Sequence, residues 1–135
     1  MTQQNQLPST GARSGLVVDV IGGDLAVRHA LKFWLELEGL TVRSYVSGAE
    51  FLEAGELTPC NCLIVDDKIP ETSALQLIAD LRGLNFDAPA ILVASQPTLA
   101  LRKQAEKVGV SIVEKPLLGN GLLDTIRDAT RGRLG

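Results

Sequence analysis

The apolar run Cys62-Leu63-Ile64-Val65 ends abruptly at Asp66-Asp67, and this short segment indicates which class of fold the 135-residue chain adopts. A short strand without a polar face is typical of a parallel sheet that helices cover on both sides. In such a sheet, the residues that carry function lie just beyond the carboxyl ends of the strands. Asp66 and Asp67 are therefore candidate site residues.

Four further apolar runs predict strands, and a helical pattern follows each one. The predicted strands cover residues 14–21, 41–46, 62–65, 90–93 and 110–113. The first helix is expected from an N-cap at Asp24 to Gly39, and two more open at capping boxes that begin with Ser47 and Ser73. The last two helices cover residues 98–108 and 121–131. Right-handed crossovers then give an α/β fold: a three-layer, doubly wound (βα)5 unit with a five-stranded parallel sheet, flavodoxin-like in form.

The carboxyl ends of these strands place charged and small residues at one edge of the sheet. The residues selected in this way are Gly22, Gly23 and Asp24 after the first strand, Asp66, Asp67 and Lys68 after the third, Ala94 and Ser95 after the fourth, and Lys115 after the fifth. We therefore expect the carboxylates and the lysine to converge in one crevice. The interpretation fails if Asp66 and Lys115 lie far apart.

Composition indicates one globular domain that does not bind nucleic acid. The chain is 45% hydrophobic and 21% charged, with a net charge of -3 and no long run of Lys and Arg, so it lacks the positive face of a nucleic-acid binder. We expect a flexible tail over residues 1–13, a single domain over 14–131 and a short tail over 132–135. The polar N-terminus lacks the apolar core of a signal peptide, and no segment is long enough to span a membrane, which predicts a cytoplasmic protein without a membrane partner.

Three features have ordinary explanations. Cys60 and Cys62 are two residues apart, so both would lie on one face of a strand, where they cannot easily form a disulfide; packing thiols are expected. His29 falls opposite the apolar stripe of its helix and offers no Ser-His or Cys-His dyad. Gly22-Gly23 before a helix could cradle a phosphate, but the segment lacks both G-x-G-x-x-G and the Walker lysine, which disfavours a nucleotide site.

Two motifs together resemble a known family. The segment Leu63-Ile64-Val65-Asp66-Asp67-Lys68-Ile69-Pro70, with the later Val113-Glu114-Lys115-Pro116, is similar to the third-strand aspartate and the fifth-strand Lys-Pro of response-regulator receiver domains, the chemotaxis-regulator-like superfamily. The resemblance covers about residues 14 to 130. It implies that Asp66 accepts a phosphoryl group from the phosphohistidine of a sensor histidine kinase, that Lys115 contacts the phosphoryl oxygens, and that the Lys115-Pro116 peptide is cis.

The departures from the family pattern concern the residues that bind metal and sense phosphate. Gly22 and Gly23 stand where the family has two acidic residues, and Asp24 comes one position too late. Ala94 stands where the family has Thr or Ser, with Ser95 next to it. Ile112 replaces the usual rotating Tyr or Phe. The sequence is therefore an atypical receiver with an incomplete phosphorylation pocket.

These departures predict weak or absent metal-dependent phosphorylation. Without the acidic pair, Mg²⁺ would rely on Asp66, a backbone carbonyl near Lys68 and water, so we expect no cofactor, or weakly bound Mg²⁺ at Asp66. A loop rearrangement that brings Asp24 close is an alternative. Lys68 and Lys115 could also balance Asp66 and Asp67 without metal and hold the pocket in one conformation.

Three functions follow from the resemblance and its departures. The first is a stand-alone, non-enzymatic receiver that takes phosphate at Asp66 from a sensor histidine kinase or a phosphotransfer protein, with no attached output domain. The second is a pseudo-receiver that acts as a phosphorylation-independent interaction module. The third is a small flavodoxin-like ligand binder or enzyme. A homodimer or target could use the last two helices, whose cations are Arg102, Lys103, Lys107, Arg127 and Arg131, although helix-dipole stabilisation explains the last two as well.

Overall fold

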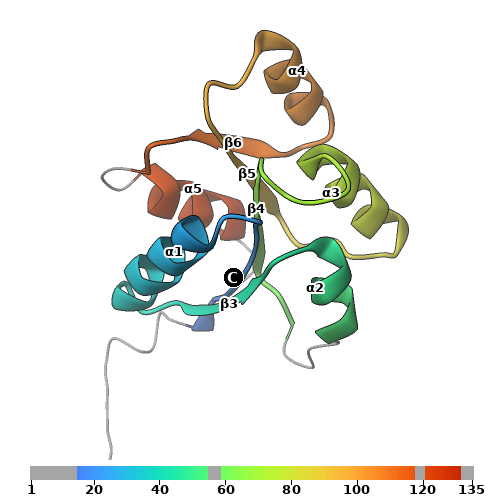
Figure 1. Ribbon diagram of the computed structural model, residues 1–135. Coiled ribbons are helices and arrows are strands. Elements are labelled where there is room, and N and C mark those ends of the chain that lie inside the picture. The colour runs from blue at the N-terminus through green and yellow to red at the C-terminus, as the bar shows by residue number, and fades with distance from the viewer. Residues whose placement is uncertain (1–14, 55–58, 118–120, 132–135) are drawn as a thin grey trace, which may run out of the picture.

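The computed structural model describes residues 15–54, 59–117 and 121–131 (Figure 1). The tails expected at 1–13 and 132–135 lie outside the described residues. Within the described part, five strands alternate with five helices. The strands are β2 (Val17–Ile21), β3 (Thr41–Tyr45), β4 (Cys62–Asp66), β5 (Ala90–Ala94) and β6 (Ser111–Glu114). The helices are α1 (Leu25–Leu37), α2 (Gly48–Ala54), α3 (Ala74–Gly83), α4 (Leu99–Lys107) and α5 (Gly121–Thr130).

All five strands pair in parallel, in the order β3-β2-β4-β5-β6. This order confirms the predicted doubly wound fold. Strand β6 begins one residue later than expected, at Ser111, which pairs with Ile91. Val110 instead helps to cap the C-terminus of α4, because its N–H donates to the Ala105 carbonyl at 2.9 Å.

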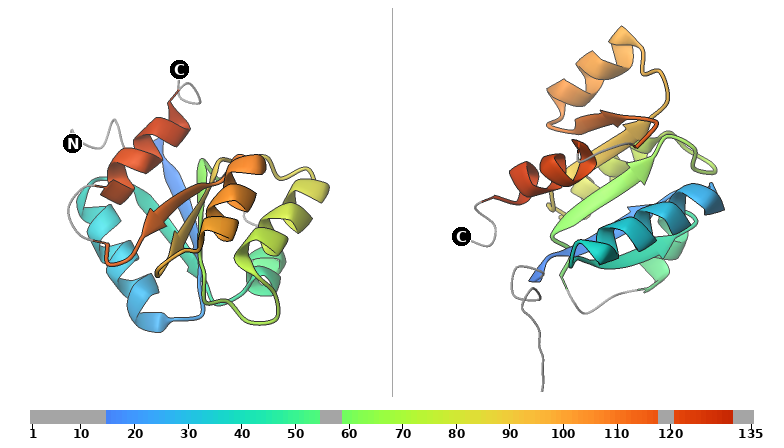
Figure 2. Two further views of the ribbon diagram at one scale, coloured as in Figure 1. Left: turned by 90° about the horizontal axis from the view of Figure 1, so that it is seen from above. Right: turned by 90° about the vertical axis from the view of Figure 1, so that its left-hand side faces the viewer.

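The sheet separates two helical layers. Helices α1 and α5 lie on one face, and α2, α3 and α4 lie on the other (Figures 1 and 2). Strand β4 supplies both cores: Cys62 and Ile64 pack in the cluster with α1 and α5, whereas Leu63 and Val65 pack in the cluster with α3. All five residues of β4 are buried, which explains why this strand has no polar face.

Short polar side chains start the helices where the sequence predicted them. Asp24, Ser73 and Thr98 are N-caps whose side-chain oxygens accept backbone N–H groups of the first turn. At Ser47 both side chains of the predicted box are engaged: Ser47 Oγ accepts the Glu50 N–H at 3.1 Å, and the Glu50 carboxylate accepts the N–H of Val46, the residue before the cap, at 2.7 Å. The second box is only half formed: Ser73 accepts the Gln76 N–H, but the Gln76 side chain donates to Asp80.

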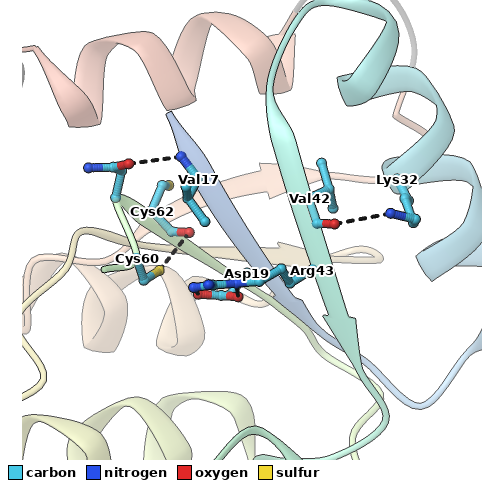
Figure 3. Close-up of polar contacts among 8 residues, drawn as sticks. Val17, Asp19, Lys32, Val42, Arg43, Cys60 and Cys62 are labelled. Carbon is cyan, nitrogen blue, oxygen red and sulfur yellow. Dashed lines mark hydrogen bonds and ion pairs between the residues drawn. The ribbon is translucent and has the colours of Figure 1, made fainter. Parts of the chain in front are cut away.

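A buried ion pair joins the first two strands, β2 and β3. The Asp19 side chain is fully buried, and Arg43 on β3 binds both of its oxygens, with Nε at 2.7 Å and Nη2 at 2.9 Å (Figure 3). The pair follows from the strand register, in which Asp19 lies beside Arg43. A buried carboxylate requires such a partner, since isolated buried charges are very costly.

The two cysteines do not share a face, which corrects the expectation from their spacing. Strand β4 begins at Cys62, so Cys60 lies before the regular strand. Cys62 packs in the cluster with α1 and α5, whereas Cys60 packs against the other cluster. The Cys60 thiol donates to the Cys62 carbonyl at 3.2 Å and lies near Asp19 (Figure 3). Burial and then Asp19 raise the pKa of the Cys60 thiol, which favours the protonated form expected of a packing thiol.

Candidate functional site

Asp66 and Lys115 meet at the carboxyl edge of the sheet. Asp66 is the last residue of β4, and Lys115 follows β6. Lys115 Nζ lies 2.6 Å from Asp66 Oδ1. The Asp66 side chain is 1% exposed, and the Lys115 side chain is 16% exposed. The Lys115 backbone N–H donates to the Ala94 carbonyl, and the Lys115–Pro116 peptide is cis. The expected convergence of acid and amine is therefore present in the structure.

Asp67 is the second carboxylate that Lys115 contacts. Its Oδ1 lies 3.0 Å from Lys115 Nζ, and its Oδ2 accepts the backbone N–H of Ser95 at 3.1 Å. The Asp67 backbone N–H donates to the Val93 carbonyl, so the ladder between β4 and β5 continues one residue beyond β4. Lys115 thus holds Asp66 and Asp67 together.

The two aspartates differ in their electrostatic environment. Burial raises the pKa of Asp66, Lys115 opposes this effect, and the nearby charge of Asp67 adds to it. Burial also acts on Asp67, but the Ser95 N–H and Lys115 lower the pKa of Asp67 overall. For Lys115, burial is outweighed by the two carboxylates, which raise its pKa. Asp66 Oδ2 accepts no hydrogen bond from any described residue, so Asp67 is the better stabilised anion.

We expect the Asp66→Asn variant to be more stable than the wild type at neutral pH, and this difference to shrink as the pH falls. Between the usual Asp pKa near 3.9 and the raised pKa of Asp66, the folded state binds more protons than the unfolded state. Wild-type stability therefore falls as the pH rises through this window, and Asn cannot show that fall. Urea titrations at about pH 4 and about pH 7 measure the effect; a difference that stays constant with pH would contradict it.

The Gly22-Gly23 loop packs directly on the end of β4. The Gly23 N–H donates to the Lys68 carbonyl at 2.7 Å, and the Gly22 N–H donates to the Tyr45 carbonyl at 3.0 Å. The Gly22 carbonyl accepts Arg28 Nη1 at 2.5 Å. Three hydrogen bonds therefore fix this loop against its neighbours.

Side chains at either glycine would collide with the site. A Cβ on Gly22 would lie 2.9 Å from Asp66 Cβ, and a Cβ on Gly23 would lie 2.9 Å from the Lys68 carbonyl oxygen. Neither glycine has the positive φ angle that glycine alone tolerates well. Close approach of the backbone is thus the reason for glycine at both positions.

The residues present do not fit Mg²⁺. The Lys68 carbonyl, which we had considered as a ligand, is bound by Gly23, and the ammonium of Lys115 lies against Asp66. Asp24 does not reach the site as the alternative required, because its carboxylate caps α1 by accepting the N–H groups of Ala26 and Val27. No described group of three His, Cys, Asp or Glu side chains could hold a metal ion. The chemistry of this site is therefore that of an ammonium between two carboxylates.

The remaining predicted site residues have different surroundings. Ala94 is buried, and Ser95 contributes its backbone N–H. Ile112 is half-buried and lines a shallow hollow with residues of α4. Lys68 is exposed and forms no ion pair with any residue that the structure describes, so its share in neutralising the aspartates stays a prediction.

The cations of the last two helices are partly neutralised. Arg102 pairs with Glu114 at 2.9 Å, and Arg131 pairs with Asp128 at 2.6 Å. Lys103, Lys107 and Arg127 are exposed.

No helix in the described part of the chain combines the length and the apolar character needed to cross a membrane.

A family model for the response regulator receiver domain matches residues 18–127, which include both Asp66 and Lys115. The chain belongs to this family. This match confirms the family that the sequence resemblance implied, and the architecture described above confirms the fold. Receivers of this family serve phosphorelay signalling.

The curated relatives of this receiver extend well beyond the region that it matches. It is 34% identical to the transcriptional regulatory protein FixJ of Azorhizobium caulinodans over 119 residues, which is 87% of this chain and 56% of that protein. It is 32% identical to the response regulator protein TmoT of Ectopseudomonas mendocina, over 85% of this chain and 53% of that protein. The receiver thus spans about half the length of the curated relatives it matches.

Solved receiver structures share the fold. A receiver domain protein from Clostridium thermocellum has a TM-score of 0.79 at 21% identity, covering 88% of this receiver and 97% of that chain. The structure titled FixJ-N has a TM-score of 0.77 at 24% identity, covering 86% and 94%.

Sequence reasoning missed two contacts that shape this receiver's site. It did not find that the Ser95 N–H binds Asp67, nor that the Gly23 N–H binds the Lys68 carbonyl. Both contacts involve backbone atoms, which no residue identity reports. The signal that was present is the second carboxylate, Asp67, directly after the buried strand.

Proposed function

We propose that this receiver acts in two-component signalling as a non-enzymatic interaction module that keeps one conformation without metal-dependent phosphoryl transfer to Asp66. One observation supports the proposal, namely the close packing of the Gly22-Gly23 loop on the end of β4. A Cβ on Gly22 would collide with Asp66, and the Gly23 N–H donates to the Lys68 carbonyl. Phosphoryl transfer needs charge on the equatorial oxygens to be neutralised, usually by a divalent cation together with a lysine. Among the described residues, Lys115 is the cation in contact with Asp66 that could perform this task.

A second candidate function is that of a phosphoacceptor. The 2.6 Å contact between Lys115 Nζ and Asp66 Oδ1 favours it, because a phosphoryl group on Asp66 would lie within reach of the ammonium. In this case a sensor histidine kinase or phosphotransfer protein supplies the group from phosphohistidine. The proposed partners are the same in both cases, in the cytoplasm, with α4 and α5 as the surface for a target or a second copy.

A small-molecule phosphodonor with Mg²⁺ discriminates between the two functions. We expect intact-mass measurements to show no phosphorylated wild-type protein, or at least a hundredfold slower modification than in a receiver with an acidic pair, since losing about 2.7 kcal/mol of transition-state stabilisation slows a reaction about a hundredfold. Asp66→Asn is the control for modification elsewhere. The same variant should bind its kinase or target as the wild type does. Rapid phosphorylation that Asp66→Asn abolishes would establish the second function and exclude the first.

A further inference from the structure

The carboxylate of Asp67 occupies two donors that together form an anion site. Lys115 Nζ lies 3.0 Å from Asp67 Oδ1, and the Ser95 N–H donates to Asp67 Oδ2 at 3.1 Å. An ammonium and a backbone N–H that converge in this way bind carboxylate and phosphate oxygens alike. The same ammonium lies 2.6 Å from Asp66 Oδ1, so any anion at these donors sits beside Asp66.

We propose that Asp67 is a resident anion: its carboxylate fills the donors that phosphoryl oxygens on Asp66 would use, and it ties Ser95 to Lys115 without phosphate. This inference rests on the proposed function, because it explains how the receiver keeps one conformation when no phosphoryl group arrives. Asp67 acts as a positioning residue. It takes no part in a bond-forming step.

The position of Asp67 in the fold makes it suited to this role. Its backbone N–H continues the β4–β5 ladder to Val93, and strand alternation directs its side chain toward the same face as Val65, between α3 and α4. There it borders a hollow that Ser73 of the α3 cap and Gln104 of α4 also line. The Asp67 side chain is 27% exposed, so a soluble anion could reach the two donors if Asp67 were removed.

Asp67 also constrains the segment that leads into α4. Ser95 is the first residue after β5, and the segment reaches the α4 N-cap at Thr98. Gln96, the next residue, has a φ of 46°. This value lies in the left-handed region, which residues other than glycine rarely adopt. A charge-assisted hydrogen bond at Ser95 holds the start of this strained segment in place.

The Asp67→Ala variant tests the proposal with inorganic phosphate as the probe. We expect two-dimensional NMR to show a saturable shift of the Ser95 amide in Asp67→Ala, with an affinity at least tenfold higher than that of the wild type. Hydrogen exchange at the Ser95 amide should be at least tenfold faster in the variant without phosphate, and phosphate should restore protection. Glu106→Gln is the matched control, since it removes one negative charge from an exposed position on α4 and should behave as the wild type.

Two outcomes would overturn the proposal. If Asp67→Ala showed no saturable phosphate shift at the Ser95 amide, Lys115 and Ser95 would not form an anion site. If the wild type and Glu106→Gln showed the same saturable shift with the same affinity as Asp67→Ala, Asp67 would not occupy that site. Asp67→Ser, whose shorter side chain carries no carboxylate to fill the two donors, replaces Asp67→Ala in the same comparison if the latter unfolds. Neither measurement requires Asp66 to react, so failure of the proposed function would appear separately, as phosphorylated wild-type protein.

Discussion

Replacing Lys115 by Met should lower the free energy of unfolding by about 3 to 5 kcal/mol at neutral pH, because removing one partner of a buried ion pair leaves the other charge uncompensated. Asp66 is 1% exposed, and among the described residues Lys115 is the cation that lies against it. Urea denaturation measures the loss. Lys103→Met is the matched control: Lys103 is exposed on α4, and its replacement should change stability by less than about 0.5 kcal/mol.

The second step of this experiment removes Asp66 as well. In an Asp66→Asn background, Lys115→Met breaks only the contact with Asp67, which is 27% exposed, so the loss should shrink to about 1 kcal/mol. The coupling between the two substitutions is therefore expected to be about 2 to 4 kcal/mol. If Lys115→Met cost the same with and without Asp66, Lys115 would not be the counter-ion of that carboxylate.

The strands and helices were predictable because each is encoded by a local pattern. Four apolar residues in succession marked β4, and single side chains such as Asp24 and Ser73 marked the helix starts. The meeting of Asp66 and Lys115 was predictable for a different reason. Parallel strands that share a direction bring their carboxyl ends to one edge, so the order of elements alone placed both residues there.

The contacts that change the chemistry of the site depend on register and backbone position. Asp19 could have been paired with Arg43 only after strands β2 and β3 were aligned residue by residue. The sequence showed that Gly22 and Gly23 lack carboxylates, but it could not show that the loop they form lies within contact distance of Asp66 and Lys68.

Restoring the acidic pair with the double substitution Gly22→Asp, Gly23→Asp should destabilise the metal-free protein by about 3 to 5 kcal/mol, from two overpacked positions and the repulsion of new carboxylates near Asp66. Both new Cβ atoms would start 2.9 Å from their neighbours, and at Gly23 that neighbour is a backbone oxygen that cannot rotate away. The loop must therefore lift from the end of β4. Gly23→Ala isolates the steric part and should cost about 1 to 3 kcal/mol. Gly83→Ala is its control, since a Cβ there meets no atom within 4 Å, and this substitution at the end of α3 should be neutral or stabilising.

Mg²⁺ should act on the double variant and not on the wild type. A lifted loop exposes the Lys68 carbonyl and presents three carboxylates with Asp66, which are the oxygen ligands that Mg²⁺ prefers. At about one hundred times its dissociation constant, Mg²⁺ would then return about 2.7 kcal/mol of stability to the variant. Thermal unfolding with EDTA and with Mg²⁺ measures this recovery. Equal stabilisation of the wild type would show that the closed Gly22-Gly23 loop opens readily and that the metal position was never lost. A variant that gains Mg²⁺ binding and phosphorylation at Asp66 together would instead assign the missing reactivity to these two glycines, because the acid, the lysine and the sheet edge are the same in both proteins.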